Sequence, residues 1–526
     1  MHSLLPFFLA MVAAIVLLNI LASKLKIAYP IVLVVAGLIV SLIPGLPTFK
    51  VDPDLIFFIV LPPLLCEASW NISYKEMKKW WRIIGSFAFV VVFFTAFSVA
   101  VVANYFIPGF SIALGFLLGG IVSPPDAVST AAITKFVKIP KSTSAILEGE
   151  SLLNDASSLI ILRFALIAIG TGQFVWSEAT LSFFWMVLGG SGIGLLLGLL
   201  FVKVQKRLST DAPSDIALTL IQPYLMYWLA EQFHSSGVLA VVAGSLYMSS
   251  QRLNFLNSTS RIRGFSVWES LVFILNGIVF IIIGLQLPDI VDGLKTEGIP
   301  LQTAIGYSVL VTVVLVIARM ISSYGAMVAT FLFRRNVIKT DTSLKNRLML
   351  PLILGWTGMR GVVSLAAALS IPITLNGQDF PQRNLILFIT FVVILLTLVV
   401  QGLTLPTIIN KSHIFDSQTS EEKERGTHQK IKFGLRKHIY SELQKKHENE
   451  MKDNLALERL LLQWEERSKA TDNTWMSPET KQMFVDLLES QRLFLTELNK
   501  DPNIDEEVIR RQLYQIDLEE ERLKMV

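Results

Sequence analysis

Long apolar runs recur along the first 410 residues of this chain and set its predicted architecture. A bilayer's hydrocarbon core is about 30 Å thick and is crossed by about 20 apolar residues in helical form. Runs of this kind predict thirteen membrane-spanning helices and therefore an all-α polytopic membrane protein. Their approximate ranges are 4–22, 28–44, 54–69, 83–107, 110–134, 143–169, 179–203, 215–233, 236–250, 265–287, 302–333, 347–371 and 384–410.

Charge is distributed unevenly and divides the chain near Asn410. Only 17% of the 526 residues are charged and 52% are hydrophobic, whereas an ordinary soluble domain carries about 25% charged residues. Half of the charged side chains lie beyond this point. We therefore expect a transmembrane domain over residues 1–410 and a charged helical tail over 411–526. Within the tail, helices are predicted at about 429–470, from Pro478 and at about 504–524.

Composition also excludes several classes of protein. The single cysteine, Cys66, rules out an intrachain disulfide framework and a zinc site built from several thiolates. The net charge of +4 is small, and no block of like charges suggests a nucleic-acid partner. The absence of a phosphate-binding loop motif weighs against a built-in ATPase. We therefore expect no cofactor beyond transported ions.

The loops between the predicted spans orient the protein in the membrane. Loops that follow odd-numbered spans hold twenty Lys and Arg residues, whereas loops that follow even-numbered spans hold only Lys50, Lys295 and Arg383. Cytoplasmic loops of membrane proteins carry the excess of basic residues. The predicted location is the cell membrane, with the N-terminus outside and the tail in the cytoplasm.

Two predicted spans contain sequence that is hostile to a helix near the middle of the membrane. The fifth span holds Pro124 and Pro125 before Asp126, and the twelfth places three glycines around Arg360. If the spans divide as six, one and six, these two occupy corresponding positions in inverted halves. Paired broken helices of this kind mark the binding site of a secondary transporter. Asp126 and Arg360 would offset the partial charges of the half-helix ends.

Ionisable residues inside spans are costly and are therefore functional candidates. In the sixth span, Glu150, Ser151, Asn154 and Asp155 follow helical spacing and form one oxygen-rich stripe. Asp155 lies deep in this span. Arg319, in the eleventh span, requires a carboxylate partner, and Glu150 is the candidate.

The oxygen-rich stripe suits a hard monovalent cation such as Na⁺, with Asp155 as its ligand. A proton and a cation can compete for one buried carboxylate, which would give electroneutral one-for-one exchange. Glu67, near the cytoplasmic end of the third span, or Asp126 could add a second titrating group. The stoichiometry therefore stays open.

At this point the motifs resemble those of the monovalent cation:proton antiporters of the sodium/proton exchanger family, in its electroneutral Asn-Asp branch. The resemblance covers about residues 1–410, and the octet ending in Asp155 is its most specific part. The first break departs from the Thr-Asp-Pro order of many members, because Asp126 follows two prolines here. The motifs that carry the resemblance are Leu61-Pro62-Pro63 with Glu67, Ser123-Pro124-Pro125-Asp126, Glu148-Gly149-Glu150-Ser151-Leu152-Leu153-Asn154-Asp155 and Gly355-Trp356-Thr357-Gly358-Met359-Arg360-Gly361.

The resemblance implies a six-helix core domain that carries the ion, a dimerisation domain, a homodimer and elevator-like alternating access. It makes Asp155 the carrier of cation and proton. The other implied roles are Asn154 as a prop of the site, Ser151 and Glu67 as near-ligands, Asp126 as a possible ligand, the Ser123 region as a source of backbone oxygen, Glu150 with Arg319 as an ion pair, and Arg360 as the charge of the second broken helix.

The expected function is therefore antiport of Na⁺, or of K⁺ or Li⁺, against H⁺, and not an enzymatic reaction. One alternative is a passive cation channel with the same buried acids, and another is a membrane sensor whose tail signals. An intramembrane enzyme is disfavoured because neither His-Glu-x-x-His nor Gly-x-Ser-x-Gly occurs. The tail either supports assembly or regulates transport through pH or a partner.

Overall fold

A computed structural model shows a chain that is mostly helical and that divides into two compact units, Met1–Asp416 and Ser417–Val526. The residues that the structure describes are 4–43, 56–126, 129–130, 132, 139, 141–173, 176–208, 211–333, 344–375, 377–412, 417–447, 462, 465, 478–498 and 506–524.

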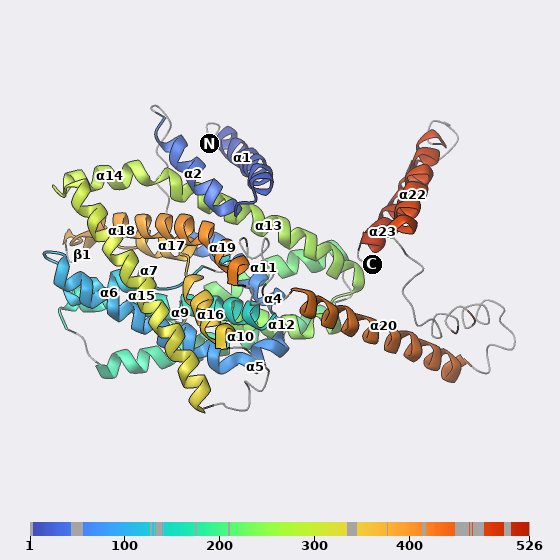
Figure 1. Ribbon diagram of the computed structural model, residues 1–526, viewed down its shortest axis with the longest axis horizontal. Coiled ribbons are helices and arrows are strands. Elements are labelled where there is room, and N and C mark those ends of the chain that lie inside the picture. The colour runs from blue at the N-terminus through green and yellow to red at the C-terminus, as the bar shows by residue number, and fades with distance from the viewer. Residues whose placement is uncertain are drawn as a thin grey trace. The chain divides into compact units, whose positions relative to one another are not determined.

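Helices make up nearly all of the first unit (Figure 1), and a short antiparallel pair of strands, β1 (Thr374–Leu375) and β2 (Gln378–Asp379), joins two of them. Three short π-helical stretches occur as well, η1 (Ile56–Val60), η2 (Ser86–Val91) and η3 (Thr397–Gln401). The α-helices are α1 (Leu4–Leu25), α2 (Tyr29–Ser41), α4 (Leu61–Asn71), α5 (Tyr74–Gly85), α6 (Val92–Phe106), α7 (Ile112–Val122), α9 (Lys141–Thr171), α10 (Trp176–Arg207), α11 (Ala212–Gln232), α12 (Gly237–Phe255), α13 (Ser258–Leu285), α14 (Leu287–Thr296), α15 (Leu301–Phe333), α16 (Leu344–Trp356), α17 (Val362–Leu369), α18 (Arg383–Leu396) and α19 (Gly402–Ser412).

Seven helical segments among the described residues are long and apolar enough to cross a membrane. The helices Tyr29–Ser41 and Ile112–Val122 are apolar but shorter. The predicted all-α membrane character is thereby confirmed, and the count of thirteen spans stays a prediction. Most of two predicted cytoplasmic loops, over residues 135–138 and 334–343, lies outside the described residues.

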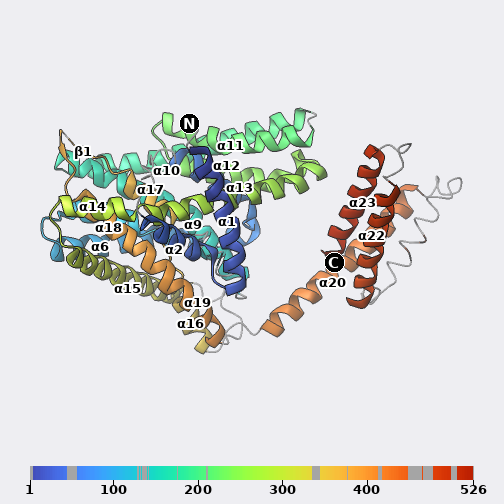
Figure 2. The same cartoon turned by 90° about the horizontal axis from the view of Figure 1, so that it is seen from above.

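Packing sorts the helices of the first unit into two groups. The first helix group comprises α1, α2, η1, α4 and α10 to α13, and the second comprises α5, η2, α6, α7, α9, α15 to α18, η3 and α19. Helix α14 contacts helices of both groups. Helices pack mostly within their own group, and few contacts cross the seam between the groups. Figures 1 and 2 both show α9 near the centre of the unit, where it packs mainly on α5, η2 and α7.

Small residues allow close helix contacts inside each group. In the first group, a side chain on Gly194 of α10 would overlap the backbone of Ala240 on α12. In the second group, a side chain on Gly119 of α7 would overlap the backbone of Ala96 on α6. Membrane helices without a hydrophobic driving force between them rely on this kind of close packing.

The tail unit contains α20 (Ser417–His447), α22 (Pro478–Leu498) and α23 (Glu506–Lys524). The prediction that its first helix begins near residue 429 is wrong, because α20 begins at Ser417. Residues 417–428 are polar on every side and have no apolar periodicity to mark a helix. The rest of the predicted 429–470 helix, beyond His447, lies outside the described residues except for positions 462 and 465.

Helices α22 and α23 pack as a hairpin around Leu488, Ile516 and Leu523. Arg492 of α22 donates to Asp517 at 2.7 Å and to Glu520 at 2.5 Å on α23. These carboxylates raise the pKa of Arg492 above its usual range, so this side chain stays cationic at every working pH.

Candidate ion-binding site

The first interruption lies where α7 ends at Val122 and residues 123–126 leave the helical path. The carbonyls at a helix C-terminus lack intrahelical partners and carry partial negative charge. Here the guanidinium of Arg360 hydrogen-bonds two of these carbonyls. Its Nε donates to the Val122 carbonyl at 2.7 Å, and its Nη2 donates to the Ser123 carbonyl at 3.3 Å. Arg360 is fully buried, so these bonds offset part of its desolvation cost.

The second interruption lies between α16 and α17, over residues 357–361. The backbone N–H of Arg360 donates to Thr397 Oγ1 at 3.1 Å, and its guanidinium also bonds the carbonyl of Gly358. A Cβ on Gly358 would lie 2.5 Å from Cδ of Arg319. A Cβ on Gly361 would lie 2.5 Å from Cγ of Asp126. Neither position can gain a side chain unless its neighbour moves, and Gly361 is the one that lies where the two interruptions meet.

Asp126 joins the two interruptions through its backbone. Its N–H donates to the carbonyl of Met359 at 2.7 Å. Its carboxylate Oδ2 accepts from the backbone N–H of Ser129 at 2.8 Å and from the Ser129 hydroxyl at 2.5 Å. This is the arrangement of an N-cap residue three positions ahead of its donor. Asp126 thus anchors the chain that follows the interruption.

Two side chains of α9 converge on one carbonyl of the first interruption. Asn154 Nδ2 donates to the Pro125 carbonyl at 3.1 Å, and Ser151 Oγ donates to the same oxygen at 3.3 Å. The expected backbone oxygen therefore comes from Pro125 and not from Ser123 itself. The Ser123 carbonyl is engaged by Arg360, and the oxygen that faces α9 belongs to Pro125. The sequence shows no sign of this, because it does not reveal which way a carbonyl points.

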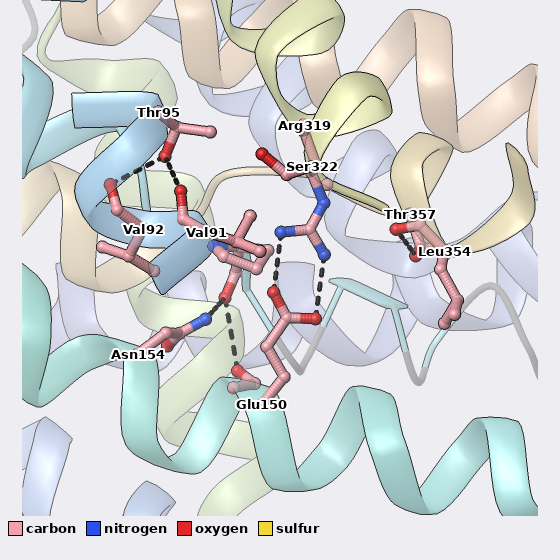
Figure 3. Close-up of polar contacts among 12 residues, drawn as sticks. Val91, Val92, Thr95, Glu150, Asn154, Arg319, Ser322, Leu354 and Thr357 are labelled. Atoms are coloured by element: carbon pink, nitrogen blue, oxygen red, sulfur yellow. Dashed lines mark hydrogen bonds and ion pairs between the residues drawn. The ribbon is translucent and has the colours of Figure 1, made fainter. Parts of the chain in front are cut away.

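Glu150 and Arg319 form a buried, bidentate ion pair between α9 and α15. Arg319 Nη1 donates to Glu150 Oε1 at 2.7 Å, and Nη2 donates to Oε2 at 2.9 Å. Each side chain is 1% exposed. Figure 3 shows the guanidinium fork facing the carboxylate, with Asn154 one turn along the same helix. The parallel geometry makes this the strong form of a charge-assisted hydrogen bond.

Asp155 differs from the other acids of the site because its carboxylate is buried without a partner. It is 7% exposed, and in the described part of the chain no hydrogen bond or ion pair engages it. It lies within electrostatic reach of Asp126. Two further buried oxygens, Asn154 Oδ1 and Ser123 Oγ, also lack hydrogen-bond partners among the described residues. The region therefore holds uncommitted oxygen atoms that suit a hard cation.

Glu67 lies on α4, in the first helix group, and not on the helices that carry the other candidates. Its Oε1 accepts from Asn71 Nδ2 at 2.5 Å, one turn along the same helix. Tyr29 lies within electrostatic reach of both Glu67 and Asp126. Glu67 and Asp126 are thus both close enough to Tyr29, on α2 of the first group, to act on it electrostatically. Among the described residues, no cluster of three or more His, Cys, Asp or Glu side chains forms a metal site.

An ion pair between two charged residues inside predicted spans is missing from the sequence-based candidates. Arg163 on α9 pairs with Glu231 on α11, with Nη2 and Oε2 2.5 Å apart. Both residues fall within apolar runs, the sixth and the eighth, and an ionisable residue in a span is a signal of function. That signal was available in the sequence, but the pairing across 68 positions was not.

Comparison with known proteins identifies the family to which the chain belongs. The model of the transmembrane sodium/hydrogen exchangers matches residues 10–411. The chain belongs to this family. It is 31% identical over 397 residues to the low-affinity Na⁺/H⁺ antiporter NhaS1 of Synechocystis sp., covering 75% of this chain and 71% of that protein. It is 32% identical over 387 residues to the sodium, potassium, lithium and rubidium/H⁺ antiporter of Bacillus subtilis, covering 72% of this chain and 57% of that protein.

A solved exchanger structure shares the fold. The sodium proton antiporter MjNhaP1 from Methanocaldococcus jannaschii aligns with a TM-score of 0.61 at 17% sequence identity, covering 78% of this chain and 98% of that one. At this identity the likeness concerns the fold. In the chain described here, both interruptions and α9 lie inside the residues 10–411 that match the family.

Proposed function

We propose that the protein is a secondary active antiporter that exchanges Na⁺, or K⁺ or Li⁺, for H⁺ by alternating access. Membership of the sodium/hydrogen exchanger family supports this function. The printed activities of its relatives support it as well, since one is a low-affinity Na⁺/H⁺ antiporter and another exchanges sodium, potassium, lithium and rubidium for protons. This is transport and not an enzymatic reaction.

This proposal depends most on the buried, unpartnered carboxylate of Asp155. A buried carboxylate without a counter-charge is costly and becomes stable when it binds a proton or a cation. Glu150, which lies on the same helix, has Arg319 as a permanent counter-charge. Asp155 has no such partner among the described residues and is therefore free to alternate between the two transported ions.

The transported cation would bind among oxygen atoms from two elements. The Asp155 carboxylate supplies the charge, and the Pro125 carbonyl and Asn154 Oδ1 supply neutral oxygens. Ser151 and Asn154 donate hydrogen bonds to Pro125 and so hold this carbonyl toward α9. The unpartnered hydroxyl of Ser123 is a further oxygen of the same region. Carboxylate, carbonyl and hydroxyl oxygens are ligands of hard cations.

Electroneutral exchange of one cation for one proton follows if Asp155 is the single carrier. The role of Asp126 supports this stoichiometry, since its carboxylate accepts two hydrogen bonds from Ser129 and serves the backbone. Glu67 lies on the first helix group and is bonded by Asn71. We also propose that the protein resides in the cell membrane as a homodimer, with its N-terminus outside and its tail in the cytoplasm.

Reconstituted vesicles with a trapped pH dye test this function. Wild-type protein should move protons when a Na⁺ gradient is imposed, and Asp155→Asn should abolish this movement because the variant cannot bind a proton or supply charge to a cation. Asp215→Asn is the matched control, since Asp215 is an equally buried acid (3% exposed) on α11 of the first group. Full exchange by Asp155→Asn would refute the assignment.

The same vesicles separate an antiporter from a channel or a sensor. Electroneutral exchange should proceed without generating a membrane potential and should be insensitive to an applied one. A cation channel would instead carry Na⁺ down its gradient without moving protons in return. A sensor would show neither flux, and its output would survive Asp155→Asn.

A further inference from the structure

A cavity lies in the seam between the two helix groups. It has a volume of about 200 Å³, enough for several water molecules. The second group lines it with Leu159 and Arg163 of α9, and the first group lines it with Tyr227, Glu231 and Ser236. The cavity is thus lined both by the helix that carries Asp155 and by helices against which it would move.

An ion pair crosses this cavity from one group to the other. Arg163 Nη2 and Glu231 Oε2 lie 2.5 Å apart, with side chains 40% and 25% exposed. Glu231 is fixed to the first group because its Oε1 accepts from the backbone N–H of Gly237, at the start of α12, at 3.2 Å. Arg163 lies eight positions beyond Asp155 on α9, which corresponds to about 12 Å along the helix axis.

The two ion pairs of α9 differ in what they connect. Glu150 and Arg319 both belong to the second group and are 1% exposed, so this pair can travel with α9 as one body. Arg163 and Glu231 belong to different groups, line the cavity and are 40% and 25% exposed. Breaking the buried pair would strand a charge in a dry interior, whereas the partly exposed pair can exchange its partner for water.

We propose that the Arg163–Glu231 ion pair is a breakable link that holds the two helix groups in the conformation described here and opens each time α9 carries Asp155 across the membrane. This inference rests on the proposed antiport by alternating access. An ion pair with side chains this exposed changes a conformational equilibrium by up to about fivefold. The link is therefore strong enough to bias the resting conformation and weak enough to open in every cycle.

Distance measurements between spin labels test the link without requiring transport. In a Cys66→Ala background, labels at Ile167→Cys on α9 and Leu181→Cys on α10 report on the seam, since both positions are exposed (56% and 74%). Arg163→Gln and Glu231→Gln should each raise the share of a second distance by up to about fivefold. The charge exchange Arg163→Glu with Glu231→Arg should restore the wild-type distribution.

A label pair inside the second group provides the control. Ile167→Cys with Ile112→Cys on α7 should give one distance that no variant changes. Elution of each variant as a single species in size-exclusion chromatography checks that it is folded. Seam distances that are identical in the wild type, both single variants and the exchanged variant would overturn the proposal.

Reversible cross-linking links the ion pair to transport. In the Cys66→Ala background, Arg163→Cys with Glu231→Cys, joined by a cleavable bis-thiosulfonate reagent, should block exchange, and reduction should restore it. Gly189→Cys with Ser235→Cys is the matched control within the first group, where a Cβ on Gly189 would lie 3.3 Å from that of Ser235. Exchange at the full rate while 163 and 231 are joined would overturn the link. If even the wild type exchanges no ions, the proposed function fails, and the distance measurements still decide whether the link exists.

Discussion

At the scale of single residues, the described acids of the site differ in which groups engage their carboxylates. Glu150 is neutralised by Arg319, and Asp126 is engaged by Ser129 and by its own backbone contacts. Asp155, five positions beyond Glu150 on α9, is buried and unpartnered among the described residues. Environment therefore gives three acids of one site different roles.

The Glu150–Arg319 pair leads to a prediction about stability. Arg319→Met leaves Glu150 buried without a counter-charge, which should cost about 3–5 kcal/mol. The double variant Glu150→Gln with Arg319→Met removes both charges and should recover most of that loss. Thermal unfolding of the purified proteins measures the difference. Equal melting temperatures for the single and the double variant would contradict the explanation.

At the scale of elements, a π-helical stretch supports the second interruption. Thr397 is the first residue of η3, and its hydroxyl accepts from the backbone N–H of Arg360 while donating to the carbonyl of Val393 at 2.8 Å. The wider π-helical turn changes which side chains face the neighbouring element, and such turns occur frequently at functional sites. One hydroxyl thus ties α18 to the unwound segment between α16 and α17.

Replacement of this hydroxyl should weaken the interruption without changing the shape of the side chain. Thr397→Val leaves the buried N–H of Arg360 without an acceptor, at a cost of about 1–3 kcal/mol, and should lower both the melting temperature and the exchange rate. Thr397→Ser keeps the hydroxyl and should behave like the wild type. If the valine variant retains full stability and exchange, the hydrogen bond has no role in holding the site.

At the scale of the whole molecule, every candidate ligand lies in the first unit, so the tail unit is not part of the proposed ion path. A protein truncated after Asp416 should still exchange cations for protons, and Asp155→Asn should still abolish this activity. Its pH profile, measured beside that of the full chain in vesicles, tests whether the tail regulates transport. Identical profiles would remove the regulatory hypothesis, and loss of exchange by a folded truncated protein would contradict the assignment of the path to the first unit.

Much of the site could be predicted because its signals are local. Span length and helical periodicity placed Glu150, Ser151, Asn154 and Asp155 on one helix, since both properties are read within a few turns. The proline and glycine clusters near the ends of α7 and α16 were visible for the same reason. The start of α20 at Ser417 was missed because a helix that is polar on every side leaves no periodic signal.

The amino-acid order is enough to predict an apolar helical protein, the stripe of oxygens on α9 and the proline and glycine clusters near the ends of α7 and α16, because backbone chemistry and burial of apolar side chains act locally. Three contacts depend on the tertiary structure: the Pro125 carbonyl faces α9, Arg360 hydrogen-bonds the C-terminal end of α7, and Arg163 pairs with Glu231 across the seam. These contacts join residues up to 238 positions apart. Their geometry depends on how two interrupted helices pack, which no local pattern of residues encodes.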